Sequence, residues 1–171
     1  MTLHELGVNH NTDKASHGYT HLYDRLFLPL QDKPITLLEI GVYMGSSIKM
    51  WRDYFTHPDR CIIGIDTTLQ YADGAKGIVL LQDDAGDIGH ITSLGQIYHP
   101  NIIIDDGSHL AHDQLTSFFG LWPSLSSGDM YIIEDLHGFH PTKDCFKLHI
   151  RYPNMDAEWY HNDQLLLLRK T

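Results

Sequence analysis

The chain has 171 residues, of which 42% are hydrophobic and 20% are charged, a composition typical of one soluble globular domain. Its formal net charge of −10 at pH 7 argues against a nucleic-acid or anionic-membrane partner, because both require a basic surface. No apolar run is long enough to span a bilayer, and the first residues lack the pattern of a signal peptide, so we expect a cytoplasmic protein.

Short apolar runs alternate with stretches of helical character along the chain. Five of these runs are apolar on both faces, which is typical of strands in a parallel sheet covered by helices. They span residues 36–42, 61–66, 77–82, 101–106 and 130–135. The alternation predicts a doubly wound α/β fold with helices on both faces of the sheet. We expect a single domain over residues 1–171, in which residues 1–34 form a helical lead-in.

Helices are expected between these strands, and a hairpin after them. Ser46 and Ser47 can cap a helix through Phe55, and residues 90–98 suit a short helix. Residues 110–122 place five apolar side chains on one helical face: Leu110, Leu115, Phe118, Phe119 and Trp122. Two further strands, 146–152 and 164–170, have no helical pattern between them. We therefore predict a mostly parallel sheet that ends in an antiparallel hairpin.

A loop with two glycines follows the first predicted strand. Gly41 allows a sharp turn, Gly45 allows the backbone to approach a ligand closely, and Ser46 begins the next helix. The G-x-x-x-G spacing differs from the G-x-G-x-x-G of dinucleotide sites. Glu39 at the strand end suits a cationic sulfonium better than a pyrophosphate, which needs amides aimed at it from a helix start. Turn packing alone is the alternative explanation of the two glycines.

Acidic residues also end the second and third strands. Asp66 ends the second, where a carboxylate can accept both ribose hydroxyls of an adenosine. Asp84 and Asp87 follow the third, where one of them can receive the adenine amino group. In register with the glycine loop, these acids predict a nucleoside-binding site.

A second group of polar residues follows the fourth and fifth strands. Asp105 and Asp106 end one strand, and Glu134 and Asp135 end the other, so the fold would bring them together beyond the sheet. Clustered carboxylates repel one another unless a cation neutralises them, and oxygen ligands favour Mg²⁺ or Mn²⁺. His109 lies in the same loop, and an imidazole can take a proton from a hydroxyl near neutral pH. The alternative is that these acids cap turns or lie on the surface.

The strings LLEIGVYMGSS, IIGID, IIIDDGSH and YIIEDLH together resemble the metal-dependent sugar O-methyltransferases of macrolide and polyketide biosynthesis, the group that methylates mycinamicin and rhamnosyl sugars. The segment from Thr12 to Tyr23 also resembles the stretch before the first strand in that group. The resemblance implies a Rossmann-like methyltransferase sheet, S-adenosylmethionine as methyl donor and Mg²⁺ (or Mn²⁺) as metal.

The resemblance also implies individual roles. Asp106, Glu134 and Asp135 would ligate the metal, and His109 would be the general base. Glu39 and Gly41 would line the methionine side of the cofactor, Asp66 its ribose and Asp84 its adenine. The full set of expected cofactor residues is Glu39, Gly41, Gly45, Ser46, Asp66, Asp84, Asp87 and Asp106.

The expected acceptor is the hydroxyl of a sugar on a glycosylated natural product. A catechol-like or other phenolic acceptor stays open, although that group typically has a lysine where His109 stands. A catalytically idle S-adenosylmethionine-binding protein also stays open, and so does a nicotinamide-dependent dehydrogenase, which the glycine spacing disfavours. The macrolide enzymes carry an extra amino-terminal domain that helps to form oligomers and the acceptor site. A homo-oligomer and the identity of the acceptor therefore stay open for this chain.

Overall fold

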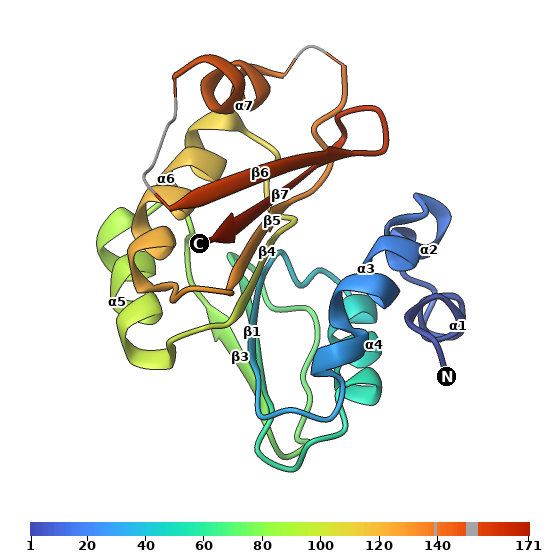
Figure 1. The fold of residues 1–171 in the computed structure, drawn as a ribbon. Helices are drawn as coiled ribbons and strands as arrows, with labels where there is room; N and C mark the ends of the chain where they lie inside the picture. Colours follow the sequence, from blue (N-terminus) through green and yellow to red (C-terminus); the bar gives the residue numbers. More distant parts are fainter. Residues whose placement is uncertain (139, 150–153) are drawn as a thin grey trace.

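The protein is a seven-stranded sheet with helices on both faces (Figure 1). The computed structural model describes residues 1–138, 140–149 and 154–171. From one edge to the other, the strands are β3 (Ile78–Gln82), β2 (Cys61–Asp66), β1 (Thr36–Ile40), β4 (Ile102–Asp105), β5 (Met130–Ile133), β7 (Leu165–Lys170) and β6 (Met155–Tyr160).

The first five strands along the chain are parallel, and the last two form an antiparallel hairpin. β5 pairs with β7 in antiparallel register, and β7 pairs with β6 in the same way. The predicted fold class, a mostly parallel sheet with a terminal antiparallel hairpin, is therefore confirmed. The strand order reverses between β1 and β4, and ligands of open α/β sheets bind at the carboxyl ends of strands at such a point.

Two hydrophobic cores lie on the two faces of the sheet, because successive side chains of a strand point to opposite faces. Leu37 of β1 belongs to the core under α1 (Leu3–Asn9), α3 (Tyr19–Phe27) and α4 (Ser46–Tyr54). Leu38 belongs to the opposite core, under α5 (Ile88–Tyr98) and α6 (Ala111–Leu121). Figure 1 shows the two helical layers on either side of the sheet.

The remaining helical segments are short. They are α2 (Asp13–Ser16), η1 (Leu28–Leu30), η2 (Trp122–Ser124), α7 (Pro141–Asp144) and the π-helical η3 (Cys145–His149). No helix lies between β2 and β3. Among the described residues, no helix combines the length and the apolar character needed to cross a membrane.

The predicted hairpin exists, but its first strand is displaced along the chain. Residues 146–149 were expected to be extended and are instead helical, and residues 150–152 lie outside the described part of the chain. Phe146 packs against Phe118 with ring centroids 4.9 Å apart, so its side chain belongs to the core beside α6 and not to an edge strand. The actual edge strand, Met155–Tyr160, is largely exposed and therefore lacks the apolar run that the prediction relied on.

Two predictions about helices were also wrong in detail. Ser46 and Ser47 do not cap α4, because Gly45 is its N-cap residue and Ser47 Oγ donates to Glu39 Oε2 at 2.7 Å. On α6, Leu110 is 62% exposed and Phe119 is 42% exposed, although both were expected on the buried face. The buried face of α6 instead combines apolar residues with hydrogen-bonded polar ones: Gln114, Ser117, Phe118 and Leu121.

Candidate functional site

A cavity of about 660 Å³ opens at the carboxyl ends of the parallel strands. The loops after β1, β2, β3 and β4 form most of its wall, and residues 11–13 of the N-terminal segment close another part. This volume lies in the range of sites that hold a cofactor or a small ligand. The cavity therefore lies where the strand order predicts a ligand.

Aspartates dominate the wall of this cavity. Eight of them line it: Asp13, Asp66, Asp83, Asp84, Asp105, Asp106, Asp113 and Asp135. Among the described residues that line the cavity there is no lysine or arginine. Such a wall favours a cationic ligand and disfavours a pyrophosphate, since carboxylates repel an anion.

The two glycines of the first loop are required by contacts within the protein. Gly41 has a φ of +93°, and a Cβ there would lie 2.1 Å from the carbonyl oxygen of Asp106. Gly45 has a φ of +74°, and a Cβ there would lie 2.2 Å from Cδ1 of Tyr71. Gly41 and Ser46 line the cavity, whereas Gly45 lies under Tyr71 and is not part of the wall.

The carboxylate of Asp66 organises the first loop. Its Oδ2 accepts the amides of Val42 and Tyr43, both at 2.9 Å, and its Oδ1 accepts the amide of Thr68 at 3.0 Å. Burial acts to raise the pKa of Asp66, but the three amides outweigh it and leave the pKa below its usual value. Asp66 therefore lines the cavity as an ionised acceptor.

The two candidate adenine ligands have different positions. Asp84 lines the cavity, and its Oδ1 accepts the amide of Gly86 at 2.8 Å. Asp87 does not line the cavity, because it caps α5 by accepting the amides of Gly89 and His90. Of these two acids, Asp84 is the one that a ligand in the cavity can contact.

Three side chains beyond β4 and β5 form a candidate metal centre. Asp106, His109 and Asp135 each offer a ligand atom, and these atoms lie within 4.8 Å of one another. His109 Nε2 lies 3.9 Å from Asp135 Oδ2. His109 Nδ1 is buried and has no hydrogen-bond partner among the described residues, although His140 Nε2 bonds the carbonyl of His109 at 2.9 Å. The two carboxylates suit a divalent cation such as Mn²⁺ or Mg²⁺.

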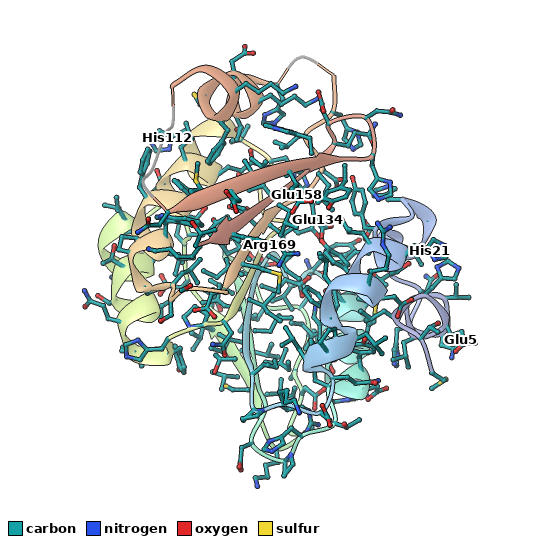
Figure 2. All side chains as sticks on the ribbon, viewed as in Figure 1. Glu5, His21, His112, Glu134, Glu158 and Arg169 are labelled. Carbon is teal, nitrogen blue, oxygen red and sulfur yellow. The ribbon has the colours of Figure 1, made fainter. Side chains whose placement is uncertain are left out.

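Two of the acids predicted in the site are turned into the interior. Glu134 is 1% exposed, lies inside the molecule at the end of β5 (Figure 2), and accepts a hydrogen bond from the hydroxyl of Tyr23. Glu39 is fully buried and is held by Ser47. Burial raises the pKa of both carboxyls. Neither residue lines the cavity.

Asp105 is also buried and points away from the metal centre. Its Oδ2 accepts hydrogen bonds from Ser117 Oγ at 2.6 Å and from the hydroxyl of Tyr131 at 3.0 Å. Burial raises the pKa of this carboxyl as well. Asp105 therefore ties β4 to α6 and β5, while its neighbour Asp106 faces the metal centre.

Lys14 is a buried charged residue beside the candidate site that the sequence patterns did not single out. It lies on α2, is 1% exposed, and forms ion pairs with Asp106, with Glu134 Oε2 at 2.9 Å and with Glu39 Oε1 at 3.3 Å. Burial acts to lower the pKa of Lys14, but the three acids outweigh it and raise the pKa above its usual value. The likeness of segment 12–23 to a known family was the only available signal.

Asp135 is surrounded by aromatic and imidazole side chains. The hydroxyl of Tyr19 donates to Asp135 Oδ1 at 2.8 Å. His137 Nε2 lies 3.3 Å and His17 Nδ1 lies 3.5 Å from the same oxygen. The second oxygen, Oδ2, is the one nearest His109. Asp135 therefore presents Oδ2 toward the candidate metal centre and uses Oδ1 for support.

The chain is similar in sequence to several curated enzymes, although no family model matches it. It is 37% identical to the 8-demethyl-8-(2-methoxy-alpha-L-rhamnosyl)-tetracenomycin-C 3'-O-methyltransferase of Streptomyces olivaceus and 33% identical to the mycinamicin VI 2''-O-methyltransferase of Micromonospora griseorubida. Each alignment covers 78% of this chain and 36% of the relative. The chain thus spans about a third of the length of these relatives.

The chain is also similar to solved structures of methyltransferases. MycE, a methyltransferase from the mycinamycin biosynthetic pathway solved in complex with Mg, S-adenosylhomocysteine (SAH) and mycinamycin VI, matches 99% of this chain with a TM-score of 0.86 and 27% identity. The chain covers 54% of that structure. CalS11, a TDP-rhamnose 3'-O-methyltransferase, shares the fold with a TM-score of 0.63 at 18% identity. The chain is therefore a homologue of one part of the sugar O-methyltransferases of macrolide and polyketide biosynthesis.

Proposed function

We propose that this chain is an S-adenosylmethionine-dependent O-methyltransferase that methylates a sugar hydroxyl on a natural product with the help of Mg²⁺ or Mn²⁺. The observation that carries the proposal is that the cavity and the candidate metal centre are continuous with each other. An aspartate-lined cavity at the switch point of the sheet includes, in one wall, the candidate metal centre of Asp106, His109 and Asp135. A methyl donor and a metal-held acceptor would meet there.

The methyl donor would lie along the first loop. Asp66, which is ionised and lines the cavity, would accept the ribose hydroxyls, and Asp84 would lie near the adenine. Gly41, Ser46 and Asp106 would contact the part of the donor that carries the sulfonium, whose positive charge suits the aspartate wall. Glu39 would act from beneath the cavity by holding Ser47 and Lys14, since its side chain does not line the wall.

The metal would be held by Asp106 and Asp135, and the resemblance adds Glu134 as a third ligand. Glu134 would reach it only by sharing the oxygen that Lys14 binds, because Tyr23 engages the other one. A divalent metal bound there would lower the pKa of the acceptor hydroxyl and fix its position.

His109 would be the general base. Its Nε2 would accept the proton of the acceptor hydroxyl, while Nδ1, which is buried, would carry the proton of the neutral ring. The hydroxyl oxygen would then attack the methyl carbon, and the C–S bond would break to release SAH. The walls of the cavity would align the two reactants and exclude water.

The acceptor class rests on the homologues. Their names specify rhamnosyl tetracenomycin and mycinamicin VI as substrates of those enzymes, so a sugar on a polyketide is the acceptor we propose here. Cys61 and Cys145 are free thiols, which agrees with a cytoplasmic location. Assembly into a homo-oligomer is compatible with this function and is not required by it.

The experiment that tests the proposal is methyl transfer from labelled S-adenosylmethionine to a rhamnosylated polyketide in the presence of Mg²⁺. We expect label in the sugar and the formation of SAH. Calorimetry should also show that SAH binds more tightly than NAD. Tighter binding of NAD, or label that reaches only a phenol, would contradict the proposal.

A further inference from the structure

The ammonium group of Lys14 lies among carboxylates from three strand ends. It contacts Glu39 near the end of β1, Asp106 just after β4 and Glu134 just after β5. Among the described residues, Glu39 and Glu134 have no other cationic partner. Because Lys14 is 1% exposed, water screens these contacts little.

We propose that Lys14 is an internal counter-ion that sets the metal affinity of the site, by occupying Asp106 and Glu134 when no metal is bound. This inference rests on the proposed function in one respect only, that a divalent cation binds beside Asp106 and Asp135. Lys14 is thus a positioning residue, which acts through the carboxylates and does not contact the reacting atoms.

The charges of the cluster give the direction of the effect. Lys14 contacts one of the three residues of the candidate metal centre directly, through Asp106 Oδ2. A divalent cation held by the same carboxylate would lie close to the ammonium, and the two positive charges would repel each other in a poorly hydrated region. The ammonium therefore weakens metal binding relative to a site with the same carboxylates and no lysine.

The same contacts explain why the carboxylates tolerate the absence of a metal. Glu39 and Glu134 are each at most 1% exposed, and a buried carboxylate without a partner is strongly destabilising. Lys14 supplies the missing charge from α2, next to residues 11–13 of the cavity wall. Loss of Lys14 should therefore lower the stability of the metal-free protein and increase the stabilisation that a metal provides.

The test is calorimetric titration of the full chain with Mn²⁺ alone, combined with thermal unfolding at each Mn²⁺ concentration. Lys14→Met keeps the length of the side chain and removes its charge. We expect it to melt at a lower temperature without metal and to bind Mn²⁺ about tenfold or more tightly than the wild type. Equal or weaker binding of Mn²⁺ by Lys14→Met would overturn the proposal.

Three further variants separate charge from other effects. Lys14→Arg keeps the charge and should keep the affinity near that of the wild type. Tyr23→Phe removes a hydrogen bond to Glu134 without a change in charge, and Lys33→Met removes a charge that is 59% exposed and paired with Asp32. Neither control should tighten Mn²⁺ binding as Lys14→Met does, and a control that does so would count against the proposal.

The remaining outcomes are also decisive. If Lys14→Met is unfolded without metal, folding on addition of Mn²⁺ supports the proposal, and failure to fold at any Mn²⁺ concentration contradicts it. If the wild-type chain and Lys14→Met both bind no Mn²⁺, the metal in the proposed function fails together with this inference. Binding by the wild type with no gain in Lys14→Met overturns the role of Lys14 alone.

Discussion

His109 Nε2 lies 3.9 Å from Asp135 Oδ2, and both residues have a left-handed backbone, with φ of +57° and +58°. Such a backbone costs on the order of 1–3 kcal/mol for a residue other than glycine. Two such residues therefore face each other across the candidate metal centre, one after β4 and one after β5. The loops hold both side chains over the same end of the sheet at a conformational cost.

We predict that His109→Ala lowers the turnover rate by roughly 10²- to 10⁴-fold, because a general base acts mainly in the transition state. The affinity for SAH should change little. His112→Ala is the control, since that side chain is 82% exposed and pairs with Asp113. Steady-state kinetics and calorimetry check both variants. Normal turnover by His109→Ala would assign proton removal to another group.

The two candidate adenosine acids should behave differently. Asp66→Ala should weaken SAH binding by about 1–3 kcal/mol, because ribose hydroxyls and loop amides lose their acceptor. Asp87→Ala should leave this affinity unchanged and reduce only the stability of α5, whose first amides it caps. Calorimetry and thermal unfolding separate the two effects. Equal losses of affinity in both variants would show that the adenosine does not lie beside Asp66.

The lowered pKa of Asp66 also predicts a dependence of stability on pH. A carboxyl whose pKa is lower in the folded state stabilises the fold above its unfolded pKa and loses this contribution as pH falls through the folded pKa. Wild-type protein should therefore lose more stability than Asp66→Asn when the pH is lowered below about 4. Urea unfolding at several pH values measures this difference, and parallel curves for the two proteins would contradict it.

Gly41 and Gly128 offer a matched pair of backbone tests. They have similar φ angles, +93° and +94°, but only Gly41 faces another backbone, at the carbonyl of Asp106. Gly128→Ala should cost about 1–3 kcal/mol of strain. Gly41→Ala should cost the same backbone strain and roughly a further 1–3 kcal/mol of stability, because the loop after β4 must move away from the added Cβ. Denaturant unfolding compares them, and equal losses would mean that the contact with Asp106 carries no energy.

Much of the sheet could be predicted because its central strands are buried on both faces. The prediction for residues 61–66 matches β2, and the other four parallel strands differ by one or two residues at their ends. The edge strand Met155–Tyr160 could not be found in this way, because its exposed face selects polar residues. Phe146, which precedes it, packs in the core from a helical segment instead.

The sequence indicated where in the fold the candidate site lies better than it indicated which side chains face the cavity. Gly41, Ser46, Asp66, Asp84 and Asp106 were expected to contact the cofactor, and all of them line the cavity. Glu134 and Asp135 point in different directions, however, because the chain leaves the extended conformation beyond β5, where Asp135 has a left-handed φ of +58°. Asp135 lines the cavity and Glu134 lies beneath it, a difference that the sequence pattern did not indicate.

Lys14 could not be found from the sequence by physical reasoning. A lysine on a short helix is normally solvated, and lysines are almost never fully buried unless they are paired. Its three partners lie 25, 92 and 120 positions further along the chain, at the ends of separate strands. Only the folded sheet brings these carboxylates to one point.

The most direct test of the whole account is methyl transfer from S-adenosylmethionine to a rhamnosylated polyketide, measured with excess chelator and again after Mg²⁺ or Mn²⁺ is restored. The metal proposed to be held by Asp106 and Asp135 predicts that the chelator abolishes the formation of SAH and that either metal restores it. Undiminished methyl transfer in excess chelator would contradict the account, and these acids would then require a role that involves no metal.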